Sequence, residues 1–209
     1  MELLKDWKWR YATKKFDTEK KISNEDLQNL KEAIQLAPSS YGLQPFKVLI
    51  VDDPEVREKL SPVSWNQPQI TEASHLFVFA AKTGMDKDYI EKFIELRADK
   101  QGKSKEELQA YGDFIFNSIK DKSNEELTHW NSRQVYIALS NLLTACANQR
   151  IDACPMEGFD NNAYNKILGL EEHGLHAVAV VAVGYRSSED SYADLEKVRF
   201  PEEVLFETV

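Results

Sequence analysis

Helical and strand patterns of hydrophobic residues alternate along this chain. After Ser23, apolar residues recur every three or four positions until Pro38, which predicts an amphipathic helix with Ser23 as its N-cap. Short apolar runs predict buried strands at 46–51, 76–81 and 176–183. Shorter helices are predicted at 54–60 and from Asp160 to Gly169. Because no repeat or linker divides the sequence, we expect one α+β domain over residues 1–209.

The longest predicted helix, at about Trp130–Gln149, is apolar on nearly every side. Val135, Ala138 and Leu142 follow a helical period, while Ile137 and other apolar residues lie on the remaining faces. A helix of this kind is buried on several sides, in a large core or across a subunit boundary. It is a first indication of a dimer.

Two other stretches have a weaker pattern. Residues 87–122 are charged and helix-prone, and Gly102 and Gly112 interrupt them, so we expect two helices or a partly exposed, mobile helical excursion. The last residues, Val204–Val209, are compatible with one more short strand.

Composition narrows the classes of function. Lys and Arg number 26 against 35 Asp and Glu, a formal net charge of −9, which argues against nucleic-acid binding and requires any anion site to be local. The longest strongly apolar stretch, Ala177–Val183, is too short to span a membrane, and the N-terminus lacks a signal-peptide core, so we expect a cytoplasmic protein. Cys146 and Cys154 do not form a CxxC pair, which predicts reduced thiols and no metal site.

Several common motifs are absent. The eight glycines include no GxG, so the sequence has no Rossmann fingerprint. Gly102-Lys103-Ser104 resembles the end of a P-loop, but Arg97 stands where that motif needs glycine. The four histidines have no metal-ligand spacing, and no GxSxG nucleophile motif occurs.

Two pairs of cations near the ends of the chain are a candidate phosphate site. Arg10 and Lys14 lie four residues apart, and Lys197 and Arg199 lie on one side if their segment is extended. Arg offers a bidentate fork to a phosphate, and Lys offers a point charge. Composition alone favours the alternative, that these are ordinary solvated charges.

Three loops are rich in polar groups. Residues 38–46 read Pro-Ser-Ser-Tyr-Gly-Leu-Gln-Pro-Phe, which fits either a helix-to-strand connection or a functional loop. Residues 155–159 follow the long helix, and Gly158 would let backbone approach a ligand, although a simple turn is the plainer interpretation. Residues 66–70 add three side-chain amides.

Taken in order, these segments resemble the nitroreductase family of FMN-dependent oxidoreductases, from Trp9 to Arg199. The motifs that carry the resemblance are Arg-x-x-x-Lys, Pro-Ser-Ser-x-x-x-Gln-Pro, Asn-Gln-Pro-x-Ile, Arg-Gln-Val-Tyr, Met-Glu-Gly-Phe and Lys-x-Arg. The resemblance implies a mostly antiparallel central sheet flanked by helices, in an interlocked homodimer. Each end of the interface would hold one FMN, bound by both chains, and the helix at Trp130–Gln149 matches the central interface helix.

The resemblance also implies roles for individual residues. The cofactor phosphate would be held by Arg10, Lys14, Lys197 and Arg199, with Tyr11 and the backbone of Ala12 or Thr13 nearby. Met156 would pack against the buried face of the flavin, and the backbone N–H groups of Glu157 and Gly158 would point at N5 and the adjacent carbonyl. Other cofactor-binding residues would be Pro155, Asn66 and Gln69. The partner protomer would contribute Pro38, Ser39, Ser40 and Gln44. Tyr41 and Phe116, the latter in the helical excursion, would lie on the substrate side.

The implied reaction is a ping-pong hydride transfer. NADH or NADPH would pass a hydride to flavin N5 and leave, and a nitroaromatic, quinone or free flavin would then be reduced in the same place. No protein base is required, so Glu157 would act mainly through its backbone. Two departures affect ring and substrate contacts: Gly42 stands where many relatives have Asn, and Gln69 where many have Lys.

Two alternatives stay open at this point. The same fold supports specialised flavin reactions, such as flavin destruction or reductive dehalogenation. A non-catalytic FMN-binding or regulatory module is the second alternative, because fold alone does not establish function.

Overall fold

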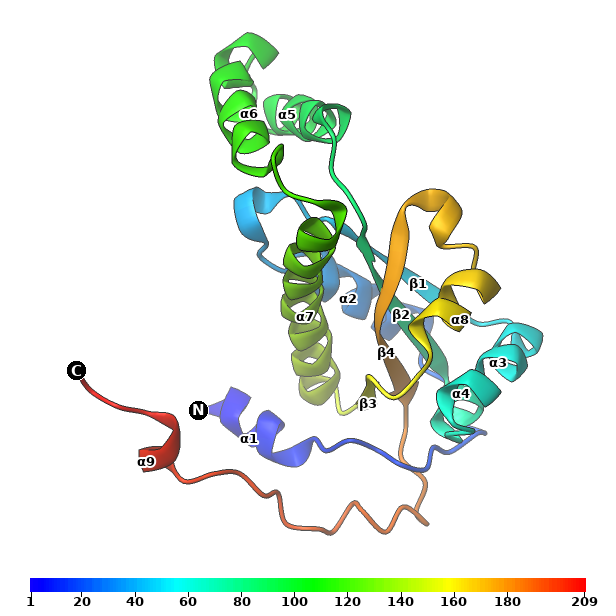
Figure 1. Cartoon of the computed structure of the whole chain (residues 1–209). Coiled ribbons are helices and arrows are strands. Elements are labelled where there is room, and N and C mark those ends of the chain that lie inside the picture. The colour runs from blue at the N-terminus through cyan, green and yellow to red at the C-terminus, as the bar shows by residue number, and fades with distance from the viewer.

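The computed structural model describes all 209 residues and has one antiparallel sheet at its centre (Figure 1). Its strands are β1 (Phe46–Val51), β2 (His75–Lys82), β3 (Asp152–Met156) and β4 (Leu175–Gly184), in the order β1-β2-β4-β3. The central strands β2 and β4 are almost wholly buried, as their continuous apolar runs require. The predicted antiparallel sheet flanked by helices is confirmed.

Nine α-helices and three 3₁₀ turns surround the sheet. The helices are α1 (Glu2–Trp9), α2 (Asn24–Gln35), α3 (Pro54–Leu60), α4 (Gln69–Glu72), α5 (Lys87–Gln101), α6 (Lys105–Ile119), α7 (Asn124–Asn148), α8 (Asn161–Ile167) and α9 (Glu202–Leu205). The 3₁₀ turns are η1 (Ser40–Gly42), η2 (Pro62–Ser64) and η3 (Glu171–His173). Helix α7 starts six residues before the predicted Trp130, where Ser123 and Glu126 form a capping box.

Each face of the sheet has its own hydrophobic core. Leu30 of α2 and Leu142 of α7 pack on one face with Phe77 and Phe79. Tyr164 of α8 belongs to the core on the other face. Strand β3 lies at the edge of the sheet, where the missing N–H of a proline is tolerated. The sequence pattern did not predict this five-residue strand.

Helices α5 and α6 form a pair that extends beyond the end of the sheet (Figure 1). A third apolar core lies between them. Gly102 ends α5 in a left-handed conformation, with φ 63°, as a break between two helices requires. The expectation that Gly112 also interrupts the helix is wrong. It lies within α6, where a Cβ atom would come within 2.9 Å of the Ile94 side chain on α5, so glycine allows the two helices to approach closely.

The C-terminal segment leaves the sheet after β4 and runs past α1 (Figure 1, red). A strand at Val204–Val209 is wrong: residues 202–205 form the short helix α9 instead, and no strand lies beside them. Apolar side chains of this segment are exposed, including Val198, Phe200, Val204 and Phe206. No helix in the chain has the length and apolar character needed to cross a membrane.

Candidate functional site

The two ends of the chain bring four cations to one cavity. A cavity of about 370 Å³ is lined by Arg10 and Lys14 from the N-terminal segment and by Lys197 and Arg199 from the C-terminal segment. A neighbouring cavity of about 330 Å³ has Arg10, Lys197 and Arg199 in its wall and reaches the last turns of α7. The predicted convergence of the two pairs is therefore present in the fold.

None of the four cations has a carboxylate partner, because all seven ion pairs of the chain lie elsewhere. Burial, and then repulsion from Arg199, lowers the pKa of Arg10. Burial, together with Arg10 and Arg199, also lowers the pKa of Lys197. In a chain of net charge −9, a cluster of unpaired cations is typical of an anion site.

Lys197 has a second task in this arrangement. Its ammonium donates to the backbone carbonyls of Trp7, at 2.6 Å, of Lys8, at 3.3 Å, and of Arg10. These carbonyls lie at the C-terminal end of α1, where a cation is favourable. Lys197 thus fastens the C-terminal segment to α1. The Arg199 Nη1 atom donates to the Val198 carbonyl, at 2.6 Å, which leaves its other donors, and the side chains of Arg10 and Lys14, available to an anion.

The end of β3 provides two unused backbone donors. Met156 is buried within the core, at 7% exposure, and the chain then turns away from the sheet at Glu157 and Gly158. No hydrogen bond within the chain uses the backbone N–H of either residue. The Glu157 side chain, by contrast, accepts a 2.5 Å hydrogen bond from the Tyr136 hydroxyl of α7. Burial, then this carboxylate, raises the pKa of Tyr136 to about 12.

The indole of Trp65 explains why residue 158 is a glycine. A Cβ atom on Gly158 would lie 2.3 Å from the Cζ3 atom of Trp65, which no side chain allows. Trp65 is nevertheless 71% exposed, and Trp65 and Asn66 both adopt left-handed backbone, with φ 57° and 55°. An exposed aromatic ring held by two unfavourable backbone conformations is typical of a functional position.

Gln69 lies beneath this loop with one polar atom unsatisfied. Its Nε2 atom lies 3.9 Å from the Cys154 sulfur on β3, whereas its buried Oε1 atom has no partner. A buried acceptor without a donor costs free energy unless a ligand or water supplies one. Cys154 is buried, and burial raises the pKa of its thiol, which disfavours the reactive thiolate.

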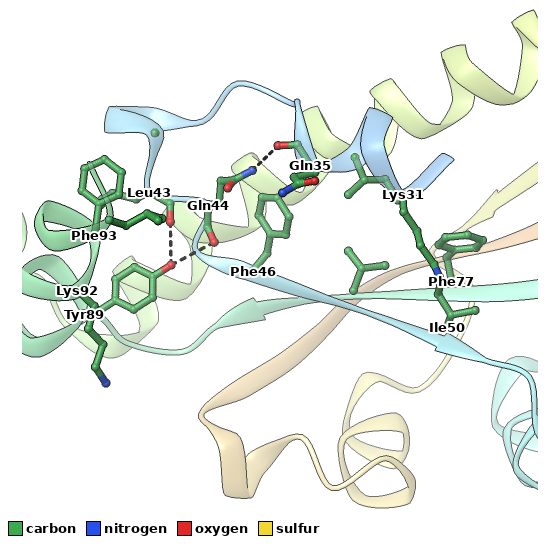
Figure 2. Close-up of a pocket in the computed structure, with 14 residues that line it drawn as sticks. Lys31, Gln35, Leu43, Gln44, Phe46, Ile50, Phe77, Tyr89, Lys92 and Phe93 are labelled. Carbon is green, nitrogen blue, oxygen red and sulfur yellow. Dashed lines mark hydrogen bonds between the residues drawn. The ribbon is translucent and has the colours of Figure 1, made fainter. Parts of the chain in front are cut away.

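The loop 38–44 lies apart from both groups. The Ser40 N–H donates to the Gln134 Oε1 atom of α7, at 2.8 Å, and Gln44 Nε2 donates to the Gln35 carbonyl, at 2.7 Å. The Tyr89 hydroxyl of α5 donates to the carbonyls of Leu43 and Gln44 (Figure 2). Within one chain, no hydrogen bond joins this loop to the four cations or to the end of β3.

The loop instead packs against the α5–α6 pair and borders an apolar cavity. Tyr41 stacks edge-on against Phe114 of α6, with ring centroids 6.2 Å apart, and Tyr41 and Phe116 contact the same apolar core. Gly42 and Gln44 line a cavity of about 600 Å³ that extends along β1 between α2 and α5 (Figure 2). Pro38 is exposed, and Ser39 and Ser40 are half-buried.

Comparison with known proteins gives this arrangement a context. The family description "Nitroreductase family" matches residues 7–185. Across 201 residues, the chain is 33% identical to an oxygen-insensitive NAD(P)H nitroreductase of Salmonella typhimurium, with 92% of each chain covered. The chain belongs to the nitroreductase family. A second member, the major NAD(P)H-flavin oxidoreductase of Aliivibrio fischeri, is 33% identical over 204 residues, with 94% of each chain covered.

The fold of this nitroreductase family member also matches solved structures. One is described as a nitroreductase in complex with FMN, from Exiguobacterium sibiricum 255-15. The TM-score is 0.86 at 21% identity, and 100% of this chain and 98% of that chain are covered. At that identity the match concerns the fold.

Two side chains at the site had no role in the prediction from sequence. Tyr136 is the last residue of the Arg-Gln-Val-Tyr motif. Its hydrogen bond to Glu157 depends on how α7 packs beside β3, which the sequence does not show. Trp65 precedes Asn66 in the amide-rich loop, and an aromatic residue in so polar a segment was the available signal.

Proposed function

We propose that this chain is an FMN-dependent NAD(P)H oxidoreductase of the nitroreductase and flavin reductase type. Its relatives in Salmonella typhimurium and Aliivibrio fischeri are an NAD(P)H nitroreductase and an NAD(P)H-flavin oxidoreductase. The observation that carries the proposal is the cluster of four cations without carboxylate partners at one cavity of an acidic protein. Nitroaromatics, quinones and free flavins are the acceptors we propose.

The cluster suits a phosphate monoester in its chemistry. A phosphate dianion needs charge and several donors, and Arg10 and Arg199 each offer a planar fork while Lys14 offers a point charge. Lys197 would contribute charge while its donors fasten α1. Binding an anion would also relieve the repulsion between Arg10 and Arg199.

The ring of FMN fits the groups around β3. The free N–H groups of Glu157 and Gly158 would donate to the ring edge, and Met156 would lie against its buried face. The unsatisfied Gln69 Oε1 atom would accept from the N–H of the ring, and Asn66 would lie beside it. Tyr11 and Ala12 line the cation cavity, and Ala12 pairs with Ala153 of β3. These two residues and Pro155, also on β3, would therefore lie between the phosphate and the ring.

When bound, FMN supplies a ring that accepts a hydride from NAD(P)H and passes reducing equivalents to an acceptor. The chain's residues hold and orient the ring, and the fixed N–H donors favour negative charge at the ring edge. Glu157 contributes through its backbone, because its carboxylate is already engaged by Tyr136. Trp65 would form one wall beside the ring, and the α5–α6 pair, with Phe116 and Tyr41, would cover the substrate side.

We further propose that the working unit is a homodimer. Tyr136 and Ile137 of α7 are 41% and 39% exposed, and the C-terminal segment exposes Phe200 and Phe206. The apolar cavity also lies along β1, which is an edge strand of the sheet. A second copy would cover these surfaces, with the C-terminal segment of one protomer on the β1 cavity of the other. It would also bring Pro38, Ser39, Ser40 and Gln44 to the partner's flavin.

Anaerobic reduction tests the proposed activity. The purified protein, loaded with FMN, is mixed with NADH or NADPH without oxygen, and its flavin absorbance is followed before a nitroaromatic, a quinone or riboflavin is added. We expect bleaching by at least one nicotinamide cofactor and recovery of colour with the acceptor. Bound FMN that neither cofactor bleaches would favour a non-catalytic FMN-binding module. Bleaching without turnover of any of these acceptors would favour a specialised flavin reaction.

A further inference from the structure

Asp190 is a buried carboxylate beside the cation cavity and takes part in no ion pair. It is 5% exposed and lies seven residues before Lys197. Its Oδ2 atom accepts hydrogen bonds from the backbone N–H of Lys14, at 2.8 Å, and of Lys15, at 3.1 Å, and from the Tyr11 hydroxyl, at 2.9 Å. Its Oδ1 atom accepts from the Tyr192 N–H, at 3.0 Å.

These four donors keep the carboxylate charged. Burial raises the pKa of Asp190, but the backbone N–H groups and the Tyr11 hydroxyl outweigh burial and hold its pKa below the ordinary value. Asp190 does not itself line the cavity, but its hydrogen-bond partners Tyr11, Lys14 and Tyr192 do. A negative charge so close to an anion site opposes anion binding by Coulomb repulsion. Its presence there calls for a compensating role.

The role follows from which segments the hydrogen bonds join. Three of the donors belong to residues 11–15, which include one pair of cations, and the fourth belongs to the segment that leads to the other pair. Phe16 pairs with Arg186, and the Ser187 N–H donates to the Lys15 carbonyl, so the two segments already run side by side before Asp190. Asp190 makes the last of these contacts between the two segments before the C-terminal segment reaches the cavity.

We propose that Asp190 is a positioning residue of the FMN phosphate pocket. It joins the Tyr11–Lys15 backbone to the segment that carries Lys197 and Arg199, so that cations from both ends of the chain face one phosphate. The inference rests on the proposed function, because it assumes that the anion is the phosphate of FMN.

The substitution Asp190→Asn separates positioning from simple charge. The variant removes the negative charge, so electrostatics alone predicts tighter FMN binding. It also breaks the hydrogen-bond pattern: if the amide oxygen faces Tyr11, Lys14 and Lys15, the amide NH₂ group faces the Tyr192 N–H, donor against donor. Positioning therefore predicts weaker FMN binding, and the two effects have opposite signs.

The experiment measures FMN and riboflavin affinities by quenching of flavin fluorescence. Riboflavin has the same ring without the phosphate, so it reports on the rest of the site. We expect Asp190→Asn to bind FMN about tenfold more weakly, as an unmatched buried donor predicts, and to bind riboflavin as the parent does. Asp53→Asn, at the N-cap of α3, is the matched control and should bind both flavins like the parent.

Two results would overturn this inference and leave the proposed function standing. In the first, Asp190→Asn binds FMN as tightly as the parent or more tightly. In the second, Asp190→Asn loses FMN affinity and riboflavin affinity by the same factor. If Asp190→Asn does not fold, Tyr11→Phe decides, because it removes one of the four links and leaves the charge. We expect it to weaken FMN binding about threefold, within the range for one hydrogen bond, and unchanged FMN binding would overturn the inference. A parent protein that does not prefer FMN to riboflavin would instead overturn the proposed phosphate site, and Asp190's role with it.

Discussion

The cation cavity and the loop 38–44 differ in how complete they are within one chain. At the cavity, two segments nearly a chain length apart are tied together by Asp190 and Lys197, and the four cations are in place. The loop 38–44 is equally well fixed, by Gln134, Gln35 and Tyr89, but no hydrogen bond connects it with the cavity or with β3.

Under the proposed function, the two regions would bind different parts of the flavin. Phosphate binding would need only one folded chain, since both ends of that chain supply the charges. Contact between the flavin and the loop 38–44 would need a second chain. Variants of each region should therefore change flavin binding in distinguishable ways.

Removing the charges of the cation cavity should have the largest effect. The double variant Arg10→Ala/Arg199→Ala loses two charge-assisted sets of hydrogen bonds to phosphate, each worth about 1.5–3 kcal/mol. We expect FMN affinity to fall about a hundredfold or more and riboflavin affinity to stay within about twofold. The apoprotein should not lose stability, because Arg10 and Arg199 repel each other. Unchanged FMN affinity by fluorescence titration would contradict the phosphate assignment.

Charging the exposed apolar face of α7 should break the dimer. Ile137→Glu would place a charge without a partner in the proposed interface, at a cost of about 2–5 kcal/mol. Sedimentation velocity should show a shift from dimer to monomer, with weaker flavin binding. Asn162→Glu, at an exposed position of α8 on the other side of the sheet, is the control and should stay dimeric. A dimeric Ile137→Glu would place the interface elsewhere.

Adding a methyl group at Gly158 should weaken binding of the flavin ring and leave binding of the phosphate unchanged. In Gly158→Ala the new methyl group would meet Trp65 at 2.3 Å, so the indole or the loop must move, at a cost of about 1–3 kcal/mol. We expect FMN and riboflavin affinities to fall by the same factor. Gly84→Ala is the control, because its new Cβ atom would come no closer than 3.2 Å to another atom, the Oδ1 atom of the Asn124 side chain. If only the FMN affinity falls, Gly158 does not lie beside the flavin ring.

The smallest expected effect is a pH dependence of the apoprotein's stability. It arises away from both the cation cavity and the loop 38–44. Burial lowers the pKa of His176, and its Nδ1 atom pairs with the Asn165 Nδ2 donor at 2.9 Å, which requires the neutral ring. Since the folded state disfavours the protonated ring, the stability is complete above the ordinary pKa of about 6.5 and is lost as the pH falls below it.

Urea unfolding at about pH 7.5 and about pH 5.5 measures this effect on either side of that pKa. We expect the apoprotein to lose about 1 kcal/mol, the scale of one buried hydrogen bond. The loss should be smaller in His176→Gln. An equal loss in parent and variant would assign the pH dependence to other groups, of which half-buried His75, whose pKa burial also lowers, is the first to test.

Much of the fold could be predicted because its elements have clear periodicity. The apolar runs of β1, β2 and β4 and the helical period of α2 each matched an element. Strand β3 was missed because it is short and contains Pro155. The start of α7 was missed because its first turn is polar, and only the Ser123 and Glu126 capping box marks it.

The site was predictable where side chains carry the chemistry. The two pairs of cations line one cavity, as the family resemblance implied, although composition alone favoured ordinary solvated charges. Asp190 could not be recognised in the same way, because its partners are mostly backbone N–H groups up to 176 residues away. Backbone donors exist at every non-proline residue, so only the fold determines which of them a carboxylate meets.

The central claim, that one chain supplies the phosphate pocket and its partner supplies the loop 38–44, is tested most directly by counting FMN in a mixed dimer. One chain carries Arg10→Ala/Arg199→Ala, and the other carries Ser39→Ala/Gln44→Ala. We expect both homodimers to bind FMN weakly. A mixed dimer, purified through two different tags, should bind one FMN per pair of chains with the parent's affinity, because one of its sites combines an intact pocket with an intact loop. A mixed dimer that binds FMN as weakly as both homodimers would contradict the claim.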